Sequence, residues 1–260
     1  MSKKFFAILT ILVIVLGVSS SLVLAKNNKE SRDIPEEDGT YDVPGHPELK
    51  VRVFVHKVKP APQPPLSELK CNLDDPNSLA IVSSTPWKLP ANFTYNLNPS
   101  SVPTSVGSAN LPTIASNAFL PWTNAISNKV TVGKGSDTTM TRKAPDGKNI
   151  ITWGRISASA LGVTYIWYYP STGEAVDVDT ILNQKYFWTW SGISTCVYTN
   201  SYDAQNILTH ELGHWFGLDD EYTSKYVNNT MYGYGFQKDA KGDTLTNGDI
   251  DGIQAIYSIY

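Results

Sequence analysis

Two histidines four residues apart, with a glutamate directly after the first, form the part of the sequence best suited to chemistry. They are His210, Glu211 and His214. On a helix, residues four apart project from one face, so the two imidazoles can bind one metal ion. Glu211 is rotated by about 100° from His210, beside the ion, where it can take a proton from a bound water. The spacing therefore predicts a metal site with an adjacent general base.

A glycine and an acidic residue continue this pattern at intervals of three. Gly217 can adopt a left-handed conformation and end the helix sharply. The chain can then turn back, so that Asp220, three residues further on, reaches the same metal. Two helical histidines and one returning ligand leave a fourth position open, as in catalytic rather than structural zinc sites. A pair of core histidines that binds no metal would need neither the glycine nor the intervening glutamate.

Several segments resemble one group of enzymes. Residues 210–220 resemble the zinc signature of the metzincin peptidases, with Asp where most members have a third His. Residues 229–233 resemble the Met-turn that lies under the metal in that clan, with Met231 as its methionine and not as a ligand. Residues 245–257 are similar to the closing helix of matrixins, and residues 161–183 to the edge-strand region of microbial matrixin-like peptidases.

The resemblance implies a fold and a cofactor. The fold would be an α+β catalytic domain with a twisted, mostly parallel sheet of about five strands, a zinc-binding active-site helix, a Met-turn and a C-terminal helix. Peptide substrate would add along the edge strand of the sheet. One catalytic Zn²⁺ is implied. The chain has no calcium-loop pattern of the animal matrixins, so the resemblance does not extend to bound calcium.

The same resemblance assigns roles to the acidic residues. Three of them stand together after Gly217, and composition alone does not choose a ligand among them. The signature places the third protein ligand at Asp220, beside the two histidines. The flanking Asp219 and Glu221 are then expected to orient the imidazoles without touching the metal. Glu211 would be the catalytic base.

Three aromatic residues follow the methionine, at Tyr232, Tyr234 and Phe236. They are candidates for the walls of a substrate pocket. Simple core aromatics are a nearly equal interpretation, and the sequence leaves both open.

The chain has two cysteines, Cys71 and Cys196. In an exported protein an even number of cysteines permits a disulfide, and we predict one between them. The competing hypothesis is a latency switch in which the Cys71 thiolate occupies the open zinc position. The Pro-Arg-Cys-Gly latency motif of the resembled family is absent.

The spacing of apolar residues predicts the elements that must position the site. Helical spacing and caps indicate three helices, the second of them capped by Asp203 and carrying the histidines. Strands and helices are mixed without regular alternation, which favours the α+β class. The expected strands are residues 91–97, 149–156, 162–169 and 174–182, the last two as a hairpin, and the expected helices are residues 111–130, 203–216 and 247–259.

The chain is expected to have three parts. Residues 1–25 have a short positive start, an apolar stretch and a small-residue end, which indicates a cleaved export signal. An uncleaved anchor that faces the domain outward is the alternative. Residues 26–70 are charged and then Pro-rich, which predicts a tether or pro-segment, although residues 49–58 alternate like a strand. Residues 71–260 form the catalytic domain, and His46 and His56 are expected to lie exposed in the tether.

Composition limits the partners. Hydrophobic residues make up 41% and charged residues 17%, as in ordinary folded proteins, and the net charge of -3 offers no basic surface for nucleic acid. We expect a monomeric, secreted zinc endopeptidase acting on peptide or protein substrates. A zinc-stabilised extracellular binding module without activity, or an effector protease of narrow specificity, are the alternatives. The intact Glu211 disfavours the binding module.

Overall fold

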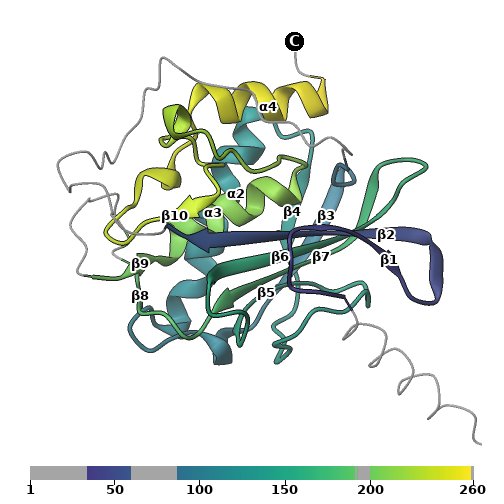
Figure 1. Cartoon of the computed structure of the whole chain (residues 1–260). Helices are drawn as coiled ribbons and strands as arrows, with labels where there is room; N and C mark the ends of the chain where they lie inside the picture. The colour runs from purple at the N-terminus through teal and green to yellow at the C-terminus, as the bar shows by residue number, and fades with distance from the viewer. Residues whose placement is uncertain (1–33, 60–86, 191, 193–199, 259–260) are drawn as a thin grey trace, which may run out of the picture.

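A single mixed sheet forms the centre of the molecule (Figure 1). The structure is a computed structural model, and it describes residues 34–59, 87–190, 192 and 200–258. Eight described strands make up this sheet, in the order β1-β2-β6-β7-β5-β3-β4, with β10 beside β2. Their bounds are β1 Gly39–Val43, β2 His46–Val58, β3 Asn92–Leu97, β4 Thr131–Lys134, β5 Asn149–Gly154, β6 Ala160–Tyr169, β7 Glu174–Asn183 and β10 Tyr234–Gly235. A separate short pair consists of β8 Trp188–Thr189 and β9 Tyr202–Asp203.

Strands β3 to β7 form a continuous group within the sheet. Within this group the pairs β3–β4, β3–β5 and β5–β7 are parallel, and β6–β7 is the antiparallel hairpin that the sequence predicts. The α+β class and the largely parallel character of this group are therefore confirmed. The described sheet is larger than expected because β1, β2 and β10 extend it beyond β6.

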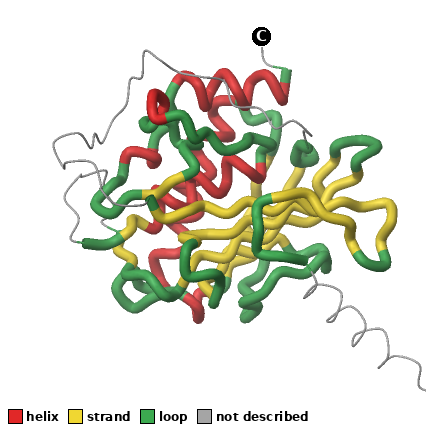
Figure 2. Tube along the Cα trace, in the orientation of Figure 1, coloured by secondary structure: helices red, strands yellow, loops and turns green. Residues whose placement is uncertain are grey.

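The described α-helices are α2 Leu111–Ala125, α3 Ala204–Trp215 and α4 Asn247–Tyr257. They are grouped on one side of the strands (Figure 2), where α2 packs against both α3 and α4 and where α3 also contacts β6. Helix α2 continues through Pro121 and ends earlier than expected. Its end follows from Ser127 and Asn128, which take left-handed φ angles of 51° and 56° that a helix cannot accommodate.

The sheet is buried on both faces. Its helix side carries the larger apolar cluster, in which Trp122, Leu208, Leu212 and Trp215 are fully buried. The indole of Trp122 donates a hydrogen bond to the Thr209 carbonyl at 2.9 Å, which fixes α2 against α3. The opposite face carries a smaller cluster built from β1, β2 and β6. Burial at this scale contributes about 25 cal/mol per Å² of apolar surface, so the sheet holds α3 firmly in place.

The tether interpretation is wrong for residues 34–59. Strands β1 and β2 form an antiparallel hairpin, and β2 runs antiparallel to β6 from Lys50 opposite Tyr168 to Lys57 opposite Ala160. Figure 1 shows both strands, in purple, along the sheet. The physical reason is the apolar alternation, which outweighs the charged composition of the segment. The weaker expectation of a strand over residues 49–58 is confirmed.

Several expectations concern residues outside the described part of the chain. They include the export signal, the Pro-rich run after residue 59, and both Cys71 and Cys196, so the disulfide stays a prediction. Among the described helices, none is long and apolar enough to cross a membrane.

Candidate metal centre

Helix α3 is fixed at its start and along its buried face. Asp203 caps the helix, and its Oδ1 accepts a hydrogen bond from the Asn206 backbone N–H at 2.8 Å, as its position predicts. Along the helix, the Trp215 indole N–H donates to the Thr180 hydroxyl of β7 at 2.8 Å. Every residue of α3 is buried. The two histidines therefore project from a helix that is buried and anchored at several points.

The end of α3 turns the chain back toward these histidines. Gly217 has a φ of 106°, and the N–H groups of Gly217 and Leu218 bond to the carbonyls of His214 and Gly213 at 3.0 and 3.1 Å. This is the left-handed helix stop that the sequence predicts. A side chain at position 217 would also come within 2.4 Å of the Trp87 carbonyl oxygen, so glycine is required there for two independent reasons.

Three ligand atoms converge after this turn. The Oδ1 of Asp220 lies 3.2 Å from His210 Nε2 and 3.5 Å from His214 Nε2. All three atoms are buried, and none has a hydrogen-bond partner among the described residues. Tetrahedral zinc with bonds of about 2.0–2.1 Å separates its ligand atoms by about 3.3 Å. The three residues therefore fit a zinc ion, and they form one of the groups in the described chain that could hold a metal.

Backbone carbonyls orient both imidazoles. The Thr230 carbonyl lies 2.7 Å from His210 Nδ1, and the Leu218 carbonyl lies 2.9 Å from His214 Nδ1. A carbonyl can only accept, so each Nδ1 carries the proton and each Nε2 presents its lone pair toward Asp220. Sequence reasoning missed these partners because backbone atoms leave no residue-type signal.

The acidic neighbours of Asp220 contact other groups than the two imidazoles. Asp219 Oδ1 accepts from the Asp220 N–H at 2.9 Å and lies 3.5 Å from Arg52 Nη2. Glu221 accepts a hydrogen bond from the Thr223 N–H through Oε1. Neither carboxylate has a described hydrogen bond to an imidazole, so the expectation that they orient the ligands is wrong. They shape the loop instead.

Glu211 lies between α3 and β6. It is fully buried, and its Oε2 accepts from the Thr164 hydroxyl of β6 at 2.5 Å. Gly162 gives it room, because a side chain there would come within 2.5 Å of Oε1. Burial alone would raise the pKa of Glu211, but His56 and the histidines of α3 outweigh it and hold the pKa below its usual value. A carboxylate at this position is a group that can act as a proton acceptor.

A tight turn supports the histidines from below. Met231 is fully buried in the turn at residues 229–232, and a side chain on Gly213 would come within 2.2 Å of its sulfur. Asp249 of α4 fixes this turn, since its carboxylate accepts from the N–H groups of Thr230 and Met231 at 2.9 and 3.2 Å. The methionine thus packs against Gly213, which lies between the two histidines in the sequence of α3.

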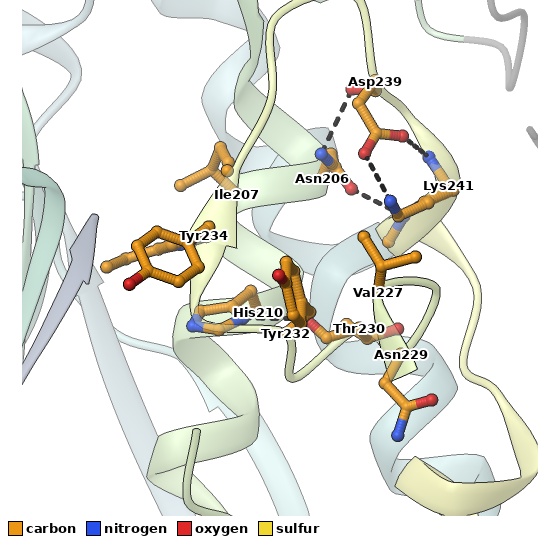
Figure 3. A pocket seen from close by; sticks show the side chains of 13 residues that line it. Asn206, Ile207, His210, Val227, Asn229, Thr230, Tyr232, Tyr234, Asp239 and Lys241 are labelled. Atoms are coloured by element: carbon orange, nitrogen blue, oxygen red, sulfur yellow. Dashed lines mark hydrogen bonds and ion pairs between the residues drawn. The ribbon is translucent and has the colours of Figure 1, made fainter. Parts of the chain in front are cut away.

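The predicted aromatic residues take different positions around a small cavity (Figure 3). Tyr232 and Tyr234 line it together with His210, and the cavity has a volume of about 20 Å³, which is room for about one water molecule. Phe236 does not line the cavity. It is buried, with its ring parallel to that of Tyr232 and the ring centroids 6.2 Å apart. Lys241 also borders the cavity and is paired with Asp239 at 3.0 Å.

His56 is the site residue that sequence reasoning placed wrongly. It is buried rather than exposed, its ring stacks on His210 at 3.8 Å, and its Nδ1 lies 3.3 Å from Glu211 Oε1. Burial, and then the neighbouring His210, lower the pKa of His56 to about 4, so the imidazole is neutral. Phe54 stacks on His214 in the same way, at 3.8 Å. His46, by contrast, lies near the β1–β2 turn and its side chain is 40% exposed.

This combination of fold and site defines a class of protein. Two helical histidines, a left-handed glycine three residues on and a buried methionine turn match the arrangement of the metzincin peptidases, with Asp220 in the place of the third His. Comparison with protein families narrows the class, because the family model described as Matrixin matches residues 86–258. The chain belongs to the matrixin family, and a zinc metallopeptidase is the activity that this family indicates. No curated protein sequence matches the chain.

Proposed function

We propose that the protein is a zinc-dependent endopeptidase that hydrolyses peptide bonds in proteins. One observation carries the proposal: three buried ligand atoms, without a hydrogen-bond partner among the described residues, converge beside the buried carboxylate of Glu211. Leaving a buried polar atom without a partner costs about 1–3 kcal/mol, so the chain gains no stability from this arrangement on its own. A bound cation would offset that cost. A structural site would have no use for a carboxylate at position 211.

Each residue of the site has its own role in the proposed reaction. His210, His214 and Asp220 would hold the zinc, which when bound polarises the scissile carbonyl and lowers the pKa of water. Glu211 accepts the proton of the attacking water and later delivers a proton to the leaving amine. Because Thr164 occupies Oε2 at 2.5 Å, Oε1 is the oxygen left to move the proton.

The proposal also includes where the enzyme acts. Residues 1–25 have the composition of an export signal, and an exported, monomeric enzyme would act on extracellular peptides or proteins. An uncleaved leader would instead anchor the enzyme to the membrane with its domain outside. The mass of the mature protein distinguishes these two outcomes, because it shows whether residues 1–25 have been removed.

A digestion assay tests the activity. Casein and a peptide library are incubated with the intact chain and with a chain cut within residues 60–86, each with and without a zinc chelator. We expect cleavage that the chelator abolishes and that added zinc restores. Zinc bound stoichiometrically, with no cleavage by either form, would replace the peptidase with a zinc-stabilised binding module.

A further inference from the structure

The structure assigns a positioning role to Tyr222: its hydroxyl binds one oxygen of Asp220, so that this carboxylate meets the metal through the other oxygen alone. The inference rests on the proposed function, because it concerns how a proposed zinc ligand is held. Tyr222 lies two residues after Asp220, and no motif of the sequence marks it. Its role follows from contacts that the folded chain makes.

The two carboxylate oxygens of Asp220 have different partners. Oδ1 faces the histidines, at 3.2 Å from His210 Nε2 and 3.5 Å from His214 Nε2. Oδ2 accepts a hydrogen bond from the Tyr222 hydroxyl at 3.0 Å. The side chain of Asp220 is only 2% exposed, so water has little access to either oxygen. One oxygen is therefore directed to the metal, and the other is bound to the phenol.

This division matters because a carboxylate can bind a metal ion through one oxygen or through both. If Oδ2 were unrestrained, Asp220 could turn and bind through both. The second oxygen would then fill the position that a catalytic zinc site keeps open for water or substrate. The Tyr222 hydroxyl competes for Oδ2 and favours binding through Oδ1 alone. It thereby helps to keep the fourth position open.

The ring of Tyr222 is held in place by the methionine turn. The preceding residue, Glu221, donates its N–H to the Met231 carbonyl at 2.8 Å and accepts from the Gly233 N–H at 2.9 Å. The Tyr222 ring lies against Gly233, where a side chain would come within 2.5 Å of it. The Tyr234 ring meets it edge to face, with the centroids 5.3 Å apart. The hydroxyl is therefore aimed by contacts that are independent of the bond it donates.

The hydroxyl of Tyr222 can be removed without disturbing these contacts. The residue is 40% exposed, so the loss of one oxygen leaves no cavity in the core. A phenylalanine ring can keep the contacts with Gly233 and Tyr234. A tyrosine that only packed against the turn would not need its hydroxyl. Tyr222→Phe therefore separates the positioning role from a merely structural one.

The first measurement is the zinc affinity of the full chain, in competition with a chromogenic chelator. For Tyr222→Phe we expect a fall of about 10–100-fold, the usual loss when a partner of a metal ligand is removed. The metal-free variant should melt at the same temperature as the unsubstituted chain. Tyr226→Phe is the matched control. It lies on the short helix Ser224–Tyr226 of the same loop, where its ring contacts Lys225 and no proposed ligand.

The second measurement reports the open position itself. Cobalt(II) is bound in place of zinc, since imidazole and carboxylate ligands accept either ion, and azide is titrated while the visible absorption of the cobalt is followed. If the freed carboxylate oxygen occupies the fourth position about nine-tenths of the time, the apparent affinity for azide falls about tenfold. We expect this fall in Tyr222→Phe and no change in Tyr226→Phe.

Tyr222→Leu removes the ring as well as the hydroxyl. It should lose zinc affinity by a similar factor to Tyr222→Phe and should also melt at a lower temperature. Unchanged zinc and azide affinities in Tyr222→Phe would overturn the inference. A loss of zinc confined to Tyr222→Leu would overturn it too, because packing of the ring would then be what matters.

These measurements do not depend on catalysis, so they separate the inference from the proposed function. If the expected losses occur in a chain that digests no peptide, the peptidase proposal is wrong and the role of Tyr222 stands. If the chain digests peptides in a zinc-dependent way but Tyr222→Phe binds zinc and azide as the control does, only the inference is wrong.

Discussion

Helix α3 is flanked by two segments that are held in different ways. On one side, the loop and turn over residues 217–232 are fixed by the chain's own side chains and carbonyls, among them Asp249 and the carbonyl groups of Leu218 and Thr230. On the other side, β2 is held by a main-chain ladder and by two ring stacks. The first kind of contact needs this sequence. The second depends on main-chain pairing and on only two side chains, Phe54 and His56.

The two sides of α3 therefore determine different properties of the site. The loop side sets the ligand geometry, so substitutions there should change metal binding or stability. The hairpin side contributes ring contacts to both imidazoles but none of the three proposed ligands, so substitutions there should leave the ligand set intact. Glu211 lies where the two sides meet, between Thr164 and His56, and its replacement gives the largest expected effect.

Glu211→Gln tests whether Glu211 is the general base. The amide cannot accept the proton of water, so activity of the cut enzyme should fall by roughly 10²–10⁴-fold. Zinc content should not change, because the three ligand residues are untouched. Activity is measured on the best library peptide, with Glu174→Gln, an exposed position on β7, as the matched control. Activity near that of the control in the Gln variant would exclude Glu211 as the base.

Asp220→Ala tests the loop side. The substitution removes a ligand, so zinc affinity should fall by more than the roughly 10–100-fold that loss of an outer partner costs. Asp219→Ala and Glu221→Ala should keep their zinc, since neither carboxylate reaches the imidazoles. Metal analysis of the three purified variants decides. A zinc-replete Asp220→Ala protein would show that the third ligand lies elsewhere.

The sequence predicts the loop side well because its determinants are local. The two histidines are four residues apart on one helix, and Gly217 reverses the chain within the next turn, so helix geometry alone brings Asp220 near them. The same local logic places the helix cap at Asp203. The orienting carbonyls escape prediction because any residue type supplies one.

The hairpin side could not be predicted because its contacts are distant in sequence. His56 and Glu211 meet only through the pairing of β2 with β6, and a one-residue slip would turn both Phe54 and His56 to the opposite face. Alternation over residues 49–58 indicates a strand but does not name its neighbour. The surrounding charges and prolines favour a tether, and the buried valines outweigh them.

Gly213→Ala should lower the stability of the protein without removing a metal ligand. The new methyl group would come within 2.2 Å of the Met231 sulfur, and overpacking of this kind costs about 1–3 kcal/mol. The free energy of unfolding, measured in urea, should fall accordingly. Gly133→Ala on β4 is the control, because an added methyl group there meets nothing within 4 Å. Equal stability of the two variants would show that the turn is looser than its contacts indicate.

The smallest expected effect concerns the segment that follows the turn. Burial, and then the nearby carboxylates of Asp203 and Asp239, raise the pKa of Asp243 to about 8. The folded state therefore holds this proton more tightly than the unfolded state, whose pKa is near 3.8. The stability that the protonated acid contributes is present below about pH 4 and is lost as pH rises toward about 8. Asp243→Asn, which stays neutral, should raise the melting temperature at pH 8 more than at pH 5. A gain of about 1 kcal/mol would appear as about 2–4 °C. An equal change at both pH values would mean that Asp243 is already ionised in the folded protein, and that this segment is less tightly closed against α3 than the turn before it.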